Sequence, residues 1–317
     1  MGSGDGDGGG VNRDPDRPGR VRAFRVAYDG RPFHGFQRQP SVPTVEDAVF
    51  DALDALGVFD RGARGRPRGY AAAGRTDAGV SALAQTVAFE CPEWCTPRAL
   101  NGELPGEVRA WAAADAPGDF HATHDAVRRE YVYDLYAPTL DDERAAEAAA
   151  TLGGDHDFHN LTPDDRGTVR DVSISIDRDG DFLSLRVAAG GFPRSLVRRL
   201  VSVIRGVAGG DRTVENVRRL LGPEPLDGPD GVPAAPPGPL LLADVDYPGL
   251  DFERDPRGVE SAVDVFDARR RDALVRARVS GRIADAVGGE NPVVDDGIGR
   301  PAESDDRRDD SDDGRDD

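Results

Sequence analysis

The sequence AGRTDAGVSA at residues 73–82 holds a carboxylate, Asp77, between an Arg-Thr pair and an Ala-Gly pair. This run is too rich in small residues for a packed helix or a regular strand. The segment QTVAFE at residues 85–90 alternates toward Val87 and Phe89, which predicts a strand. We therefore expect Asp77 in a short rigid loop at a strand end, where functional side chains usually lie. The alternative is a turn aspartate that bonds its own backbone.

The segments around this loop alternate between strand and helix patterns. Upstream, VRAFRVAYD at residues 21–29 predicts a strand, and the apolar spacing after Thr44 predicts a helix with one buried face. Downstream, we expect a short helix around residues 96–104 and a strand near residues 108–114. This order of elements indicates an α+β fold, with an antiparallel sheet that carries helices on one face.

A second half of similar pattern follows the link Pro117–Asp119. The segments expected in it are a strand at 127–136, an Ala-rich helix at 140–152, a hairpin at 169–177 and 182–189, an amphipathic helix from 193 or 194 to 208, a helix at 213–221 and a closing apolar run at 240–247. We therefore divide the ordered chain into a first half at residues 21–116 and a second half at residues 117–250.

The segments outside these halves have a different composition. Residues 1–20 are mostly Gly, Asp, Arg and Pro and are expected to be a disordered tail. Residues 251–290 are expected to form a charged, helical extension. Residues 291–317 are expected to be a disordered acidic tail, because the last 17 residues hold nine acids against three arginines.

The net charge of −19 would ordinarily argue against a nucleic-acid partner. The chain has no Lys, however, and its 40 basic residues are all Arg. Such a Lys-free, Asp-rich composition is typical of proteins adapted to molar salt, where a Debye length of about 3 Å leaves little repulsion of a polyanion. RNA is therefore not excluded. The run RGARGRPRG at residues 61–69 is a candidate phosphate contact, or else a solvated basic loop.

The cysteines and histidines predict no metal site. Cys91 and Cys95 have no second Cys pair, and the His pairs in FHATH (residues 120–124) and DHDFH (residues 155–159) lack the other ligands of known zinc motifs. No signal peptide and no apolar run of about 20 residues is present. We therefore expect a cytoplasmic protein with reduced thiols and no membrane contact.

Several motifs resemble those of the tRNA pseudouridine synthases of the TruA family, over roughly residues 21–248. The matching segments are YDGRPFHGFQRQ (28–39), VPTVEDAV (42–49), AGRTDAGVSA with QTVAF (73–89), LPGEVRAW (104–111), DFHATHDAVRREYVYDL (119–135), DHDFHNL (155–161), GGFPRSLVRRLVSVIRG (190–206) and LLLADVDYP (240–248). Their number and order make the match far more specific than GRTDAG alone. The resemblance implies the pseudouridine synthase fold, in which two RRM-like (ferredoxin-like) halves with antiparallel sheets form a central cleft, usually in a homodimer.

The resemblance also implies catalytic roles. The family's nucleophilic aspartate falls on Asp77, its active-site tyrosine on Tyr131, and the arginine that pairs with the aspartate on Arg198. An arginine within a few ångströms keeps a sheltered carboxylate ionised and fixes its orientation. Tyr131 would lie against the flipped uracil, although a strand tyrosine can equally be a core residue.

Further residues are candidates for substrate binding. Gln37 and Arg38 lie in a loop whose aromatic and amide side chains suit base contacts, although the loop can equally cap the core. Arg75 flanks Asp77 and is a candidate phosphate ligand. Two more arginines, Arg194 and Arg205, recur with Arg198 at helical spacing and would hold phosphates.

Three positions depart from the family pattern. His is common in the family where this chain has Ser81, Arg194 and Ser195. A role in the family's tRNA contacts therefore does not carry over to these positions.

The resemblance predicts an isomerase that converts uridine to pseudouridine in the anticodon stem-loop of tRNA, with positions 38–40 expected from the family. The reaction needs a nucleophilic carboxylate, which attacks either C1′ or the uracil ring, and it needs no cofactor. Two alternatives remain. One is a non-catalytic RNA-binding protein built from RRM-like halves. The other is a glycoside hydrolase, although that chemistry generally uses two acids and the Asp77 loop holds one.

Overall fold

The computed structural model describes residues 19–226 and 231–288, which form two compact units divided between Phe266 and Asp267. The described strands and helices α1–α5 belong to the first unit. Helix α6, Pro256–Gly288, runs from the first unit into the second, over the range where a charged helix is expected. The tails expected to be disordered lie outside the described residues, except for Gly19 and Arg20, and Arg20 already belongs to a strand.

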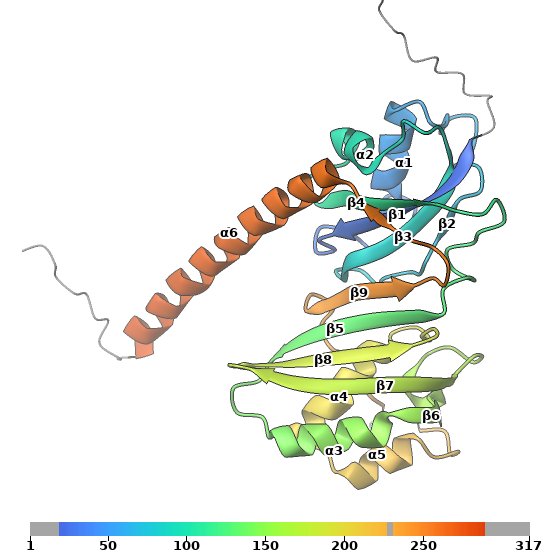
Figure 1. The fold of residues 1–317 in the computed structure, drawn as a ribbon. Helices are drawn as coiled ribbons and strands as arrows, with labels where there is room; N and C mark the ends of the chain where they lie inside the picture. Colours follow the sequence, from blue (N-terminus) through green and yellow to red (C-terminus); the bar gives the residue numbers. More distant parts are fainter. Residues whose placement is uncertain (1–18, 227–230, 289–317) are drawn as a thin grey trace, which may run out of the picture. The chain divides into compact units, whose positions relative to one another are not determined.

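A single mixed sheet runs through the first unit (Figure 1). Its strands are β1 (Arg20–Tyr28), β2 (Ala71–Ala72), β3 (Ser81–Cys91), β4 (Val108–Asp115), β5 (Arg128–Tyr136), β6 (Gly154–Asp157), β7 (Val169–Asp179), β8 (Phe182–Ala189), β9 (Leu240–Asp246) and β10 (Glu253–Arg254). Their spatial order is β10-β4-β1-β3-β9-β5-β8-β7-β6, with β2 paired to β3. The α+β class is therefore confirmed, whereas the likeness of each half to an RRM stays a prediction.

Strand β9 joins the strands of the two predicted halves. It pairs antiparallel with β5 and parallel with β3, so the two expected antiparallel sheets are continuous across one parallel seam. In this seam Ala82 of β3 pairs with Leu242 of β9, and Leu242 pairs with Tyr131 of β5. Because Ala82 follows closely on Asp77, the register brings the Asp77 loop and Tyr131 to the same point of the sheet.

Two helices cover the part of the sheet that contains β1, β3 and β4. Helix α1, Val45–Ala55, begins where its pattern predicts, and the Thr44 hydroxyl accepts a hydrogen bond of 3.2 Å from the Asp47 amide. Its buried side chains are Val45, Val49, Phe50, Ala52 and Leu53. Helix α2 spans Pro97–Glu103. Both free cysteines, Cys91 and Cys95, are buried in this part.

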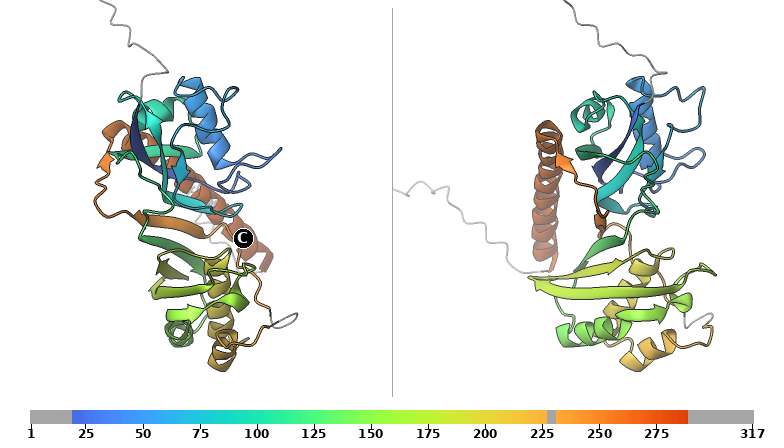
Figure 2. Two further views of the ribbon diagram at one scale, coloured as in Figure 1. Left: turned by 90° about the vertical axis from the view of Figure 1, so that its right-hand side faces the viewer. Right: turned by 45° about the vertical axis from the view of Figure 1, so that its right-hand side comes forward.

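Three helices cover the part that contains β5, β7 and β8 (Figures 1 and 2). They are α3 (Asp142–Leu152), α4 (Leu196–Ala208) and α5 (Val214–Leu220), and α3 packs against α4, α5 and β7. Helix α4 begins later than its apolar pattern predicts, because Ser195 has a left-handed backbone with φ of 59°. None of the described helices is long and apolar enough to cross a membrane.

Candidate active site

The Asp77 loop is held from several sides. The buried Thr76 places its hydroxyl 2.8 Å from the Tyr28 hydroxyl, and its carbonyl accepts from the Phe36 amide at 3.1 Å. The Gln85 side chain donates to the Gly74 carbonyl at 2.8 Å. Within the loop, the Val80 amide donates to the Asp77 carbonyl at 3.1 Å. This loop precedes β3, as predicted, and these hydrogen bonds fix the backbone that carries the Asp77 side chain.

Ser81, the first position that departs from the family pattern, makes a close contact with the turn after β1. The Gly30 amide donates to the Ser81 hydroxyl at 3.1 Å. A Cβ atom at Gly30 would lie 1.9 Å from the Val80 carbonyl oxygen, so this approach requires glycine. Ser81 therefore ties the turn after β1 to the start of β3, directly behind the Asp77 loop.

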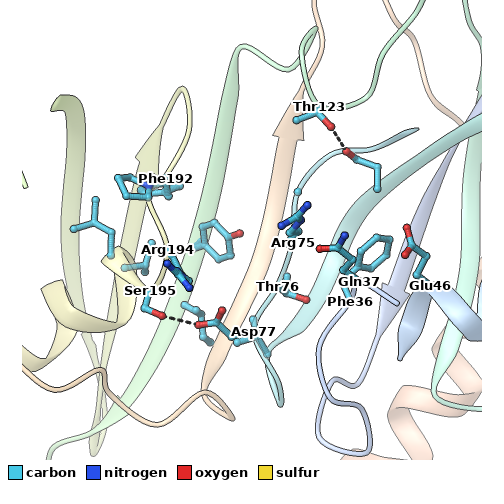
Figure 3. A pocket seen from close by; sticks show the side chains of 18 of the residues that line it. Phe36, Gln37, Glu46, Arg75, Thr76, Asp77, Thr123, Phe192, Arg194 and Ser195 are labelled. Carbon is cyan, nitrogen blue, oxygen red and sulfur yellow. Dashed lines mark hydrogen bonds between the residues drawn. The ribbon is translucent and has the colours of Figure 1, made fainter. Parts of the chain in front are cut away.

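Asp77 faces a cleft of about 890 Å³ that both predicted halves line. In Figure 3, Phe192, Arg194 and Ser195 come from one side of this cleft, and Phe36, Gln37 and Glu46 come from the other. The lining holds four arginines (Arg66, Arg75, Arg194, Arg198) and three acidic residues (Glu46, Asp77, Asp164). The lining thus carries a small positive excess, of one formal charge, in a chain of net charge −19. A positive excess favours an anionic ligand.

Arg198, on the first turn of α4, forms an ion pair with Asp77. Its Nη1 atom lies 2.9 Å from Asp77 Oδ2, and its Nε atom donates to the Ala235 carbonyl at 2.6 Å. The Ala235 amide in turn donates to the Arg198 carbonyl at 3.0 Å. The Arg198 side chain is 17% exposed and the Asp77 side chain 36%, so the arginine is sheltered while the carboxylate remains open to the cleft.

The second donor to Asp77 is a residue without an assigned role in the sequence analysis. The Ser195 hydroxyl donates to Asp77 Oδ2 at 3.0 Å, across the cleft (Figure 3). Nothing in the sequence signals this bond, because it depends on the left-handed backbone of Ser195.

Tyr131 lies beside this pair on β5. It is 9% exposed, and its ring packs edge-on against Phe192 at 5.4 Å between centroids. Burial raises the pKa of Tyr131 to about 12, with Arg129 lowering and Asp77 raising it. The phenol that faces the cleft is therefore neutral at physiological pH.

This raised pKa predicts how Tyr131→Phe responds to pH. Between pH 7 and pH 10 the Tyr131 phenol stays protonated, because its pKa of about 12 lies well above this range. We expect the ratio of wild-type to Tyr131→Phe turnover to stay constant, within about twofold, from pH 7 to pH 10. Rates of the predicted reaction, pseudouridine formation, measured at matched ionic strength give this ratio. A ratio that changes between pH 8 and pH 10 would contradict the raised pKa.

Arg194 and Arg75 also line the cleft, as the prediction of their substrate-binding role requires. The Arg194 amide donates to Asp164 Oδ2 at 2.7 Å, and its guanidinium lies 3.0 Å from Asp164 Oδ1. These bonds, the amide's first, lower the pKa of Asp164. Arg194 remains 62% exposed, and Arg75 is exposed as well. Gln37 completes the predicted substrate-binding residues that line the cleft.

Two predicted substrate-binding residues are not part of this lining, Arg38 and Arg205. The Arg38 side chain lies 3.0 Å from Asp47 Oδ1 and donates to the Gly65 carbonyl at 3.0 Å. Arg205 is an exposed residue in the last turn of α4. Of the basic run at residues 61–69, Arg66 lines the cleft.

The described residues contain no group of three or more His, Cys, Asp or Glu side chains that could hold a metal ion. The ring centroids of His121 and His124 lie 4.2 Å apart, and His121 lines the cleft. The His156 ring is hydrogen-bonded to the Gly153 carbonyl at 2.9 Å. The histidine pairs therefore contribute to packing and to the cleft wall.

Known proteins resemble this chain closely. A family model described as tRNA pseudouridine synthase matches residues 148–248. tRNA pseudouridine synthase A of Natronomonas pharaonis is 60% identical over 267 residues, covering 83% of this chain and 99% of that protein. The Haloarcula marismortui protein of the same name is 56% identical over 276 residues, covering 84% and 100%. That of Methanothrix thermoacetophila is 39% identical over 260 residues, covering 80% and 93%.

The likeness to solved structures is slight: the archaeal box H/ACA sRNP Nop10-Cbf5 complex gives 16% identity and a TM-score of 0.34, covering 62% of this chain and 47% of that chain. The full-length relatives decide the family, because they match this chain over nearly their whole length at identities that imply common descent. With the motifs in order along the sequence, they show that the chain belongs to the tRNA pseudouridine synthase A (TruA) family.

Proposed function

We propose that this tRNA-uridine isomerase forms pseudouridine in the anticodon stem-loop of tRNA, at the positions 38–40 expected from its family, with Asp77 as the nucleophile. The observation that carries the proposal is the ion pair of 2.9 Å between Asp77 Oδ2 and Arg198 Nη1, in a cleft lined by four arginines. A carboxylate with one cationic partner and an open side is suited to nucleophilic attack.

The reaction exchanges one glycosidic bond for another. Asp77 attacks C1′ or the uracil ring, the bond from C1′ to N1 breaks, the uracil turns, and C1′ bonds to C5. The bond to Asp77 breaks again and restores the carboxylate, while C5 loses its proton and N1 gains one. Arg198 keeps the carboxylate ionised and oriented before the attack. The Tyr131 and Phe192 rings, which pack edge-on, give the turning base an apolar wall.

The target nucleotide has to leave its stack to reach Asp77. Flipping costs a few kcal/mol and costs least in loops and at stem ends, which favours the anticodon arm as the substrate. Arg75 and Arg194 lie on the cleft wall and would bind the phosphates that flank the flipped nucleotide.

Two subunits of a homodimer in the cytoplasm would then share one tRNA, as is usual in the family.

Tritium release from tRNA labelled at C5 of uridine tests the activity, and chemical mapping of pseudouridine tests the position. We expect release with a whole tRNA in molar salt, and mapped sites confined to the anticodon stem-loop. Sites in another arm would reject the proposed substrate region. Binding of tRNA without any release would favour the alternative of a non-catalytic RNA-binding protein.

A further inference from the structure

We propose that Ser195 is a positioning residue, whose hydroxyl holds Oδ2 of Asp77 so that Oδ1 becomes the attacking atom; this inference rests on the proposed function. Two donors converge on Oδ2, the Ser195 hydroxyl at 3.0 Å and Arg198 Nη1 at 2.9 Å. Among the described residues, no hydrogen bond to Oδ1 is formed by a side chain or an amide. The carboxylate is thus anchored through one oxygen and free at the other.

The Ser195 hydroxyl does not form the helix-capping hydrogen bond that its position would favour. Ser195 is the N-cap of α4, and a serine there usually accepts a hydrogen bond from an amide of the first helical turn. In this helix the Ser195 side chain makes no such bond and donates to Asp77 instead. The helix therefore lacks the stabilisation of a side-chain cap at Ser195, and the hydroxyl contacts the candidate nucleophile instead.

The backbone at Ser195 supports the same assignment. Its φ of 59° and ψ of 10° lie in the left-handed region, which costs a residue with a Cβ atom conformational free energy. Neighbouring bonds hold this turn: the Thr162 hydroxyl donates to the Arg194 carbonyl at 3.1 Å, and the Arg194 amide donates to Asp164 at 2.7 Å. Backbone strain that is maintained by its surroundings is typical of functional sites.

Two donors on one oxygen limit rotation of the Asp77 carboxylate, because a turn about its last bond would break both contacts. Oδ1 is then presented to the cleft. When its electron pair forms the bond to carbon, Oδ2 becomes the carbonyl oxygen of the ester and can keep both hydrogen bonds. The site therefore needs no rearrangement of these donors during attack.

Ser195→Ala and Ser195→Gly separate this role from a structural one. Both remove the hydroxyl, but glycine relieves the left-handed backbone while alanine keeps the Cβ atom. We expect both variants to lose about 10- to 100-fold in the single-turnover rate constant, since a hydrogen bond to a charged acceptor is lost. We expect tRNA affinity to stay within about twofold of wild type, and the glycine variant to melt above the alanine variant.

Ser41→Gly is the matched control, because Ser41 is the other described non-glycine residue with a positive φ, at 65°, and is exposed outside the cleft. It is expected to keep the wild-type rate. A wild-type rate in Ser195→Gly would overturn the proposal, because the hydroxyl would then be dispensable. A loss of tRNA affinity that accounts for the slower rate would overturn it as well. Asp77→Asn, measured in parallel, distinguishes a failure of the positioning role from a failure of the proposed function. If Asp77→Asn is inactive while Ser195→Gly keeps the wild-type rate, only the positioning role of Ser195 is rejected.

Discussion

Asp77→Asn is expected to lower pseudouridine formation by at least about 10⁴-fold while tRNA binding and the melting temperature change little. The amide has nearly the same shape and can still accept from Ser195 and Arg198, but it is not a nucleophile. Loss of a nucleophile that forms a covalent intermediate commonly costs this much or more. Tritium release measures turnover, and filter binding measures the affinity for tRNA.

Asp164→Asn provides a matched control for this experiment. Asp164 also lines the cleft and also pairs with an arginine, at 3.0 Å from Arg194, whereas the arginine partner of Asp77 is Arg198. We expect turnover within about tenfold of wild type, the size of effect that follows from weakening one exposed ion pair and the turn it holds. If Asp77→Asn retained more than about 1% of wild-type turnover, the carboxylate could not be the nucleophile.

Arg198→Ala is expected to lower kcat by about 100- to 1,000-fold, the effect of removing a preorganised charged donor from a site. The substitution leaves Asp77 with Ser195 as its remaining donor and leaves the Ala235 carbonyl without its bond of 2.6 Å. Affinity for tRNA is expected to fall by only a few fold, because Arg66, Arg75 and Arg194 stay in the cleft.

Arg205→Ala is the control on the same helix, since Arg205 has the same charge but does not line the cleft. Its kcat is expected to match that of the wild type. Single-turnover rates at saturating enzyme, together with affinities from binding curves, separate the two effects. A wild-type rate in Arg198→Ala would show that the Asp77–Arg198 ion pair is not needed for catalysis. An equal loss of rate in Arg198→Ala and Arg205→Ala would attribute the effect to the loss of one positive charge rather than to the ion pair.

Periodic segments of this protein could be predicted from the sequence because their patterns are local. The apolar spacing after Thr44 correctly predicts α1, and the alternation in residues 85–90 lies within β3. The parallel pairing of β9 with β3 could not be predicted in this way, since it joins Ser81 to Leu241 and leaves no mark on either segment alone. The parallel pairing of β3 with β9, which joins the two halves that line the cleft, therefore appears only in the folded structure.

The candidate site shows the same division between local and tertiary information. Arg194, Arg198 and Arg205 recur at helical spacing, but Arg194 precedes α4. Arg205 lies about 10 Å further along the helix axis than Arg198 and does not line the cleft. Arg38 is held instead by Asp47, a neighbour in space from the first turn of α1. The sequence marked Ser195 only as a departure from the family pattern. Its contact with Asp77 could not be predicted, because the backbone at Ser195 is left-handed, which is uncommon for serine.

The position of β9 in the middle of the sheet has a consequence for the order in which a ribosome makes this protein. Asp77 emerges early, but its partner Arg198, the Ala235 carbonyl that orients Arg198, and β9 at Leu240–Asp246 emerge much later. A nascent chain that ends before β9 lacks the strand that bridges β3 and β5. Most of the chain must therefore be translated before Asp77 meets these partners, and we expect unfinished chains to carry no activity toward the cell's tRNA.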